Sequence, residues 1–152
     1  MVVMESGSAR TLALEQQVCY ALSIAARRVV AAYKPLLEPL GLTHPQYLAM
    51  VALWQHGPLN VKDLGALLSL DSGTLSPLLK RLDSMGLVER RRSLRDERSV
   101  TVTLTDRGDH LRRSAQQVHE EVVRRLGLTN DELAQLQTVL QRVSAATAET
   151  VA

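Results

Sequence analysis

The chain has 152 residues, 45% of them hydrophobic and 22% charged, which suits one globular domain or one domain with added dimerisation helices. No apolar run approaches the roughly 20 residues of a membrane span, and the first residues lack the pattern of a signal peptide, so we expect a cytoplasmic protein. A single cysteine excludes an internal disulfide and a Cys-rich metal site, and the four histidines are scattered, so we predict no metal site and no cofactor.

The net charge of +2 is unevenly distributed along the chain. Residues 80–98 contain seven Lys or Arg and four acids, a local charge of +3 that leaves −1 for all other residues. A basic segment on a nearly neutral chain indicates one face that binds a polyanion. A solvated basic loop is the alternative that charge alone leaves open.

The N-terminal part predicts a long helix from residue 12 to about residue 32, which Pro35 ends or kinks. Cys19 would lie about two turns inside this helix, too far from its N-terminus for the helix dipole to stabilise a thiolate much. Cys19 and Tyr33 share a face, but at 14 residues apart they are separated by about 21 Å along the helix. Two copies crossing antiparallel would bring them together, which predicts a thiol site across a dimer interface; an inert core cysteine is the alternative. The shared face carries Cys19, Leu22, Ala26, Val29 and Tyr33.

The middle third predicts three short helices, over about residues 46–55, 61–68 and 75–85. Thr43 and Asn60 are the expected N-caps of the first two. Thr74 is the expected N-cap of the third, because that start leaves Pro77 in the first turn. The residues expected to be buried are Leu48, Val51 and Leu53 or Trp54 in the first helix, Leu64, Leu67 and Leu68 in the second, and Leu75, Leu78, Leu79 and Leu82 in the third.

The pattern then changes to a period of two, which predicts a β-hairpin. Residues 87–92 and 100–104 are the expected strands, and the polar loop 93–99 gives the hairpin a basic tip. Thr105 is expected to cap a long helix that runs to about Leu126. A capping box over residues 129–132 opens the last helix.

Two short helices, a polar turn and a basic hairpin form the pattern of a winged helix-turn-helix, so the predicted fold class is mainly α with a small β-hairpin. The second of these helices would present hydroxyls and cations to a major groove, and the hairpin would contact the neighbouring backbone or minor groove. A helical core whose hairpin has no such role is the alternative. The candidate DNA-binding residues are Asp71, Ser72, Thr74, Ser76, Lys80, Arg81, Arg90, Arg92, Arg95, Asp96 and Arg98.

The chain resembles MarR-type transcription regulators and, within them, the organic hydroperoxide sensors called OhrR, over nearly its whole length. The recognition-helix and hairpin stretches resemble MarR-type proteins in general, whereas a cysteine followed by a tyrosine fourteen residues later is specific to the sensors. The stretches that carry the resemblance are 19–22, 33–37, 41–47, 70–82 and 96–98.

This resemblance implies one MarR-type domain over residues 1–152, in which 1–40 and 105–152 supply dimerisation helices and 43–104 bind DNA. It implies a homodimeric repressor that binds a pseudo-palindromic double-stranded DNA operator while reduced. An organic hydroperoxide would oxidise Cys19 to a sulfenic acid, which would form a mixed disulfide with a small cellular thiol, since the chain has no second cysteine. The winged parts would then shift and release the DNA.

The resemblance also implies that tyrosines of the other subunit hydrogen-bond to the thiolate. Tyr33 matches one of them, but the second falls on His44, and Tyr47 matches a different family position. An imidazole can donate to a thiolate or pair with it as a cation. The role is therefore either kept or lost at His44, and we take His44 and Tyr47 as candidate thiolate-supporting residues beside Tyr33.

Two other functions compete with redox sensing. One is a MarR-type regulator released by a small phenolic or apolar anion, with Cys19 structural. The other is a one-cysteine thiol peroxidase, but no Pro-x-x-x-Thr-x-x-Cys pattern or second catalytic group surrounds Cys19. We therefore expect that the protein is not an enzyme.

Overall fold

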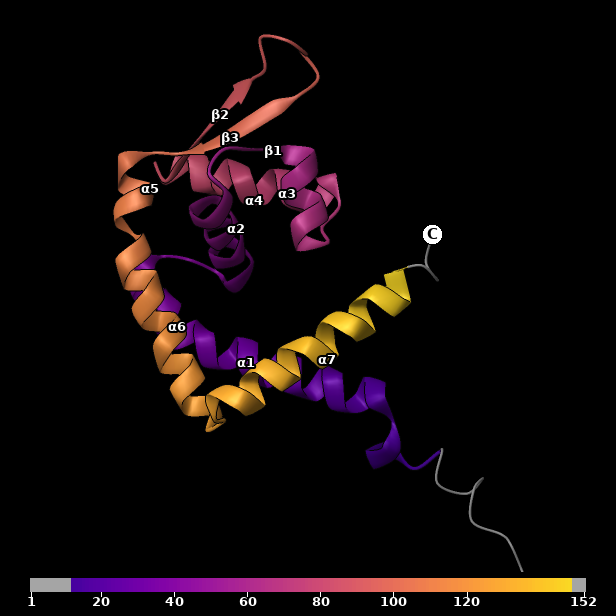
Figure 1. Ribbon diagram of the computed structural model, residues 1–152. Coiled ribbons are helices and arrows are strands. Elements are labelled where there is room, and N and C mark those ends of the chain that lie inside the picture. Colours follow the sequence, from indigo (N-terminus) through magenta and orange to yellow (C-terminus); the bar gives the residue numbers. More distant parts are fainter. Residues whose placement is uncertain (1–11, 149–152) are drawn as a thin grey trace, which may run out of the picture. The chain divides into compact units, whose positions relative to one another are not determined.

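The computed structural model describes residues 12–148. Its main elements are α1 (Val18–Leu37), α2 (His44–His56), β1 (Leu59–Asn60), α3 (Val61–Leu68), α4 (Ser72–Ser84), β2 (Val88–Arg92), β3 (Val100–Leu104), α5 (Asp106–His110), α6 (Arg112–Leu126) and α7 (Asn130–Ala148) (Figure 1). Two 3-10 turns, η1 (Leu14–Gln16) and η2 (Glu38–Leu40), flank α1. The predicted fold class is confirmed, and the chain divides after Val118 into two units. No helix in the described range is long and apolar enough to cross a membrane.

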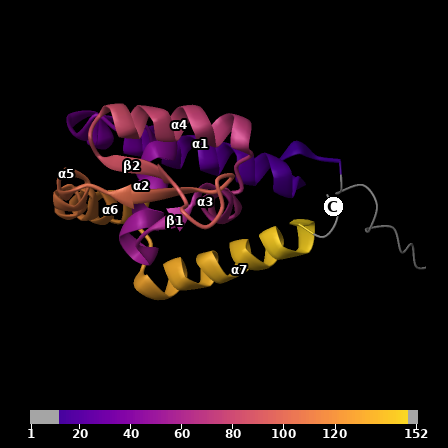
Figure 2. The same cartoon turned by 90° about the horizontal axis from the view of Figure 1, so that it is seen from above.

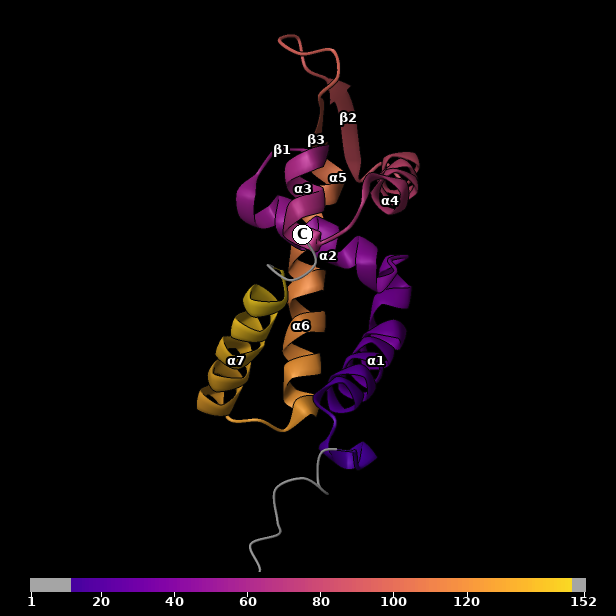
Figure 3. The ribbon, with the colours of Figure 1, turned by 90° about the vertical axis from the view of Figure 1, so that its right-hand side faces the viewer.

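The predicted hairpin is present and pairs with a third strand. β2 and β3 are antiparallel, with Val88 opposite Leu104 and Arg92 opposite Val100. The two-residue β1, which is too short to give a periodic signal, adds to the other side of β3 in the order β1–β3–β2. The hairpin projects away from α3 and α4 (Figures 1 and 3). At the base of the hairpin, α4 lies on the side of β2 and α3 lies on the side of β1 (Figures 2 and 3).

Side-chain caps fix the starts of α2 and α3 as predicted. The Thr43 hydroxyl accepts the Gln46 N–H, and the Gln46 side chain accepts the Thr43 N–H at 3.0 Å, a complete capping box. Asn60 accepts the Asp63 N–H at 2.7 Å. Both caps satisfy N–H groups that have no partner inside their own helix.

The predicted start of α4 is wrong. Asp71 Oδ1 accepts the Thr74 N–H at 2.8 Å, so Asp71 is the N-cap and the helix begins at Ser72. Pro77 therefore lies inside the helix and leaves the Gly73 carbonyl without its helical donor. Because Gly73 is exposed, water can bond to that carbonyl. The preference of aspartate for the N-cap position therefore predicts the start of α4 better than the usual position of proline in the first turn does.

Leucines of α3 and α4 form much of the core, close to the prediction. Full burial of one such side chain contributes about 1.5–3 kcal/mol relative to exposure. Leu67 departs from the predicted pattern, since it is 52% exposed. The leucines of these helices that are at most 1% exposed are Leu64, Leu75, Leu79 and Leu82.

Helix α2 lacks the single buried face that its sequence predicted. Leu48 is exposed, whereas Met50 and Leu53 are buried. The helix contacts α1, α3, α4 and β3, so neighbours surround it on several sides and its buried residues do not form one stripe. Trp54 is half-buried and donates its indole N–H to the Gly108 carbonyl at 3.0 Å, which joins α2 to α5.

Helix α1 both starts and ends later than predicted. Gln17 is extended, with ψ at 118°, so the helix begins at Val18 and Cys19 is its second residue rather than two turns inside. The helix continues through Pro35 to Leu37, because the complete burial of Leu37 anchors its last turn. Along α1, only Tyr33 and Leu37 are buried.

The long helix predicted after β3 is interrupted. Thr105 caps α5 as expected by accepting the Gly108 N–H at 3.1 Å, but the helix breaks at Leu111 before α6 begins. The break follows the turn where Trp54 binds the Gly108 carbonyl. Gly108 also lies against the hairpin so closely that an added Cβ would collide with the carbonyl of Leu87.

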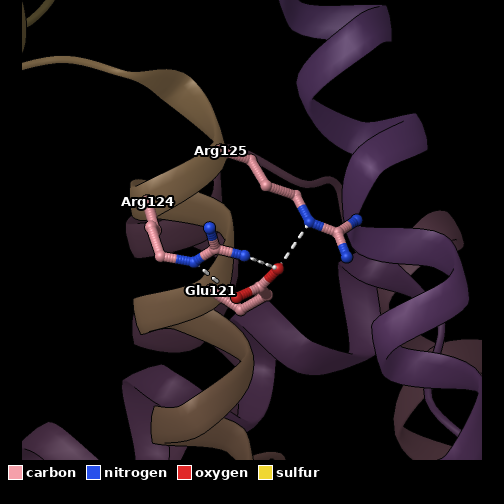
Figure 4. Close-up of polar contacts among 3 residues, drawn as sticks. All are labelled: Glu121, Arg124 and Arg125. Atoms are coloured by element: carbon pink, nitrogen blue, oxygen red, sulfur yellow. Dashed lines mark hydrogen bonds and ion pairs between the residues drawn. The ribbon is translucent and has the colours of Figure 1, made fainter.

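The second unit, from residue 119, contains the end of α6 and α7. Glu121 accepts hydrogen bonds from Arg124 and Arg125, each at 2.7 Å at its shortest (Figure 4). These hydrogen bonds lower the pKa of Glu121 to about 2. The cluster lies on one helical surface at spacings of three and four residues, and it stabilises the end of α6 locally.

Helix α7 opens as predicted, with the Thr129 N–H donating to Glu132 at 2.8 Å and the Glu132 N–H donating to Thr129 at 3.2 Å. No residue of α7 is buried. Its leucines and valines nevertheless recur at helical spacing, which gives the helix an apolar side. These residues are Leu133, Leu136, Leu140 and Val143.

Candidate functional site

The packing of α4 leaves one of its faces on the surface. Leu75, Leu79 and Leu82 are buried, so the polar side chains between them lie on the other side of the helix. These are Ser72, Thr74, Ser76, Lys80 and Arg81, all exposed. Hydroxyls and cations on a single exposed helix face suit phosphate and base-edge contacts, and their individual roles stay predictions.

The hairpin tip carries exposed cations on a loop held by its own hydrogen bonds. Ser93 accepts the Arg95 N–H at 3.2 Å, and Asp96 accepts the Arg98 N–H at 3.0 Å. The backbone of Ser93 also donates to the Ser99 carbonyl at 2.7 Å, which closes the loop. Asp96 thus shapes the loop, while the side chains of Arg92, Arg95 and Arg98 are exposed.

Arg90, one of the predicted DNA-binding residues, forms an ion pair within the protein. Arg90 Nε donates to Asp83 Oδ2 at 3.0 Å, an ion pair that joins β2 to the end of α4. This pair connects the hairpin to α4, and the hairpin flanks the exposed face of that helix. Sequence reasoning missed Asp83, because no spacing rule connects a helix with the strand that follows it.

A cleft of about 860 Å³ lies between α3, α4 and the hairpin. Apolar side chains such as Leu75 and Leu79 line it together with both cations and acids. The charged residues in its lining are Lys62, Asp71, Arg90, Asp96 and Arg98. The cleft therefore opens between the two surfaces predicted to contact DNA.

A second cluster joins the C-terminal half of α1 to the start of α2. The ring centroid of Tyr33 lies 5.0 Å from that of His44 and 5.3 Å from that of Tyr47, and His44 and Tyr47 are 6.2 Å apart. A hydrogen bond joins the two tyrosine hydroxyls. The three residues predicted to support a thiolate are thus neighbours within one chain, and no sequence signal had indicated the bond between Tyr33 and Tyr47.

Burial sets the protonation of this cluster. Burial raises the pKa of Tyr33 and of Tyr47, so both phenols are protonated at neutral pH. Burial lowers the pKa of His44 below its ordinary value of 6.5, so its imidazole is neutral at pH 7. In the single chain the cluster can therefore donate neutral hydrogen bonds but carries no positive charge.

Cys19 lies at the opposite end of α1, fourteen residues from Tyr33, and is exposed. Its position in the first turn places it where N–H groups lack helical partners and the dipole favours negative charge. The expectation that this dipole would be out of reach is therefore wrong. Across residues 12–148, no three His, Cys, Asp or Glu side chains come together to hold a metal ion.

Comparison with known proteins agrees with this architecture. Residues 42–100, from the start of α2 to the start of β3, match the model of the MarR family. The chain is 43% identical over 127 residues to the organic hydroperoxide resistance transcriptional regulator of Bacillus subtilis, covering 84% of this chain and 86% of that protein. The chain belongs to the MarR family. Like the regulators of that family, it is a DNA-binding transcription regulator.

Other MarR-type regulators are also similar. The chain is 42% identical to the regulator TtmR of Methylorubrum extorquens over 86% of this chain and 67% of that protein. Reduced AbfR bound to DNA superposes with a TM-score of 0.79 at 28% identity, covering 91% of this chain and 95% of AbfR. AbfR, from Staphylococcus epidermidis, has also been solved overoxidized on DNA and with a disulfide formed.

Proposed function

We propose that this MarR-family protein is a homodimeric repressor that senses organic hydroperoxides through Cys19. In the reduced state it binds a pseudo-palindromic operator through α4 and the hairpin of each subunit. Oxidation of Cys19 shifts the DNA-binding parts and releases the operator. The similarity to a hydroperoxide resistance regulator and to AbfR, which is known in reduced and oxidised forms, supports this proposal.

The observation that carries the proposal is the distribution of exposure along α1. The N-terminal part of the face that bears Cys19 is uncovered in the single chain, where Cys19, Leu22 and Ala26 are all exposed. The same face ends at Tyr33, which is buried beside His44 and Tyr47. A second copy of α1, crossing antiparallel, covers this apolar surface and brings each Cys19 to the partner's tyrosine cluster.

The chemistry uses only the cysteine, the peroxide and an external thiol. The Cys19 thiolate attacks the terminal oxygen of ROOH, the O–O bond breaks, and the leaving alkoxide takes up a proton as ROH. The product is Cys19 sulfenic acid. A small thiol R′SH then attacks the sulfenic sulfur, forming a mixed disulfide and releasing water. Reduction by further thiol returns Cys19 to the thiol state.

A gel-shift experiment tests the proposal. Duplexes selected from a random library by the reduced protein are expected to contain two half-sites about one helical turn apart. Cumene hydroperoxide with glutathione is expected to abolish binding, and dithiothreitol to restore it. The Cys19→Ser variant is expected to bind with or without peroxide. A wild type that keeps its affinity after peroxide treatment refutes the proposal.

The cleft between α3, α4 and the hairpin supports one alternative function. Its lining combines apolar side chains with three cations and two acids, and the excess of cations favours a small phenolic or apolar anion, which would compete with DNA for the same surfaces. In that case release needs no oxidation, and Cys19→Ser responds like the wild type. Salicylate titrated into the gel shift of both variants separates the two functions.

A further inference from the structure

Tyr47 is the least expected member of the tyrosine cluster. It is 5% exposed, on α2, and its ring lies at 39° to that of Tyr33, with the centroids 5.3 Å apart. A tyrosine that is this deeply buried requires a partner for its hydroxyl, and that partner is the hydroxyl of Tyr33. Tyr47 therefore has its polar atom turned toward another phenol rather than toward solvent.

The direction of this hydrogen bond follows from the number of protons available. The Tyr33 hydroxyl has a single proton, so if that proton is donated to a thiolate, Tyr47 is the donor and the Tyr33 oxygen the acceptor of the bond between the two phenols. Tyr33 then keeps its own proton for donation to another acceptor. A hydroxyl that accepts one hydrogen bond becomes a stronger donor of the next, because the bonds polarise each other.

His44 contacts the same ring in a different way. Its centroid is 5.0 Å from that of Tyr33 with the ring planes at 57°, a tilted aromatic contact. Tyr33 thus contacts both an imidazole and a second phenol, which are neighbours of each other, and only the phenol is hydrogen-bonded to its oxygen in the described contacts. This fixes both the ring and the oxygen of Tyr33.

We infer that Tyr47 is a positioning residue that acts through Tyr33: its hydroxyl donates to the Tyr33 oxygen and aims the Tyr33 O–H at the Cys19 thiolate of the partner subunit. The inference rests on the proposed function, since it presumes that Tyr33 meets Cys19 across the dimer. It assigns Tyr47 no direct contact with the sulfur. The two phenols thus form a relay, in which Tyr47 donates to Tyr33 and only Tyr33 donates to the thiolate.

A double-mutant cycle on the full-length dimer tests this order. Tyr33→Phe, Tyr47→Phe and the double variant keep their rings and lose only hydroxyls, and Tyr20→Phe is the matched control on α1. The measurement is the rate of Cys19 alkylation by iodoacetamide across pH 5–10, with thermal unfolding recorded for each variant. Tyr47→Phe is expected to slow alkylation at pH 7 by about two- to tenfold, the scale of one hydrogen bond. Its half-maximal rate is expected at higher pH than in wild type.

The decisive result is non-additivity. If Tyr47 acts through Tyr33, the double variant alkylates no more slowly than Tyr33→Phe alone. Additive losses mean that Tyr47 contacts the thiolate directly and overturn the relay. An effect of Tyr33→Phe without any effect of Tyr47→Phe also overturns it, while leaving the proposed function intact. If neither variant changes the profile, the relay and the cross-dimer thiol site both fail.

Discussion

Replacement of Gly108 by alanine is expected to destabilise the protein strongly, because α5 meets the hairpin at this residue. An added Cβ would collide with the backbone carbonyl of Leu87 and lie 3.3 Å from the Leu104 side chain. The first neighbour is backbone, so relief requires α5 to move away from Leu87, the residue just before β2. That movement also stretches the 3.0 Å bond from the Trp54 indole to the Gly108 carbonyl.

The magnitude follows from these two losses. Overpacking costs about 1–3 kcal/mol, and the indole hydrogen bond contributes about 0.5–1.5 kcal/mol. A total of about 1.5–4.5 kcal/mol lowers Tm by roughly 3–18 °C for a chain of this length. Calorimetry at one fixed protein concentration measures the shift, since dimerisation would make Tm depend on concentration.

Gly73→Ala is the matched control for Gly108→Ala. Its added Cβ would meet only the Asp71 side chain, at 3.3 Å, and the position lies within α4, where alanine is the better helix former. Its Tm is expected to stay within about 3 °C of wild type, the shift for a change below 1 kcal/mol. Equal Tm values for the Gly108→Ala variant and wild type would refute the contact between α5 and the hairpin.

Four further predictions follow from other contacts. Arg95→Ala is expected to weaken binding to all duplexes alike and to reduce the slope of log K against log salt by about 0.9; a loss confined to one base pair contradicts this. Asp83→Asn is expected to lower Tm by no more than about 4 °C, because the Arg90 pair is partly exposed, yet to weaken DNA binding by freeing the hairpin; unchanged affinity in a gel shift argues against that role. The Glu121 carboxylate stabilises the folded state above its ordinary pKa of 4.5, and this contribution disappears as pH falls toward 2. The Tm difference between wild type and Glu121→Gln is therefore expected at pH 6 and should vanish near pH 2. Since burial lowers the pKa of His44, the unfolded chain takes up its proton first, and wild type is expected to lose stability below about pH 6.5 more steeply than His44→Gln.

The features that sequence predicted well are those that a few adjacent residues decide. Thr43 with Gln46, Asn60 with Asp63, and Thr129 with Glu132 each close a hydrogen bond over three residues, so residue types and spacing suffice. The hairpin strands followed from alternation over five residues. The buried leucines of α4 followed from a helical period with one covered side.

The features that sequence did not predict depend on neighbours distant in the chain. Helix α2 is enclosed by several elements, so Leu48 and Met50 could not be sorted by period. The break at Leu111 accompanies a bond from Trp54, a residue 54 positions before its acceptor Gly108. Pro35 lies inside α1 because Leu37 is buried in the core, and the packing of Leu37 is not visible in the local sequence.

The start of α1 has the largest consequence for the proposed chemistry. Cys19 lies in the first turn of the helix, where N–H groups have no helical partner. In the proposed dimer, a hydrogen bond from Tyr33 of the partner subunit to the thiolate would contribute about 1.5–3 kcal/mol, the scale for a charged group, and this bond requires the second subunit. Peroxide sensing and recognition of a two-fold operator then depend on the same dimer. A chain that is kept monomeric is expected to lose sensing, because no partner phenol supports its thiolate. It is also expected to lose operator recognition, because one subunit cannot contact two half-sites at a fixed spacing.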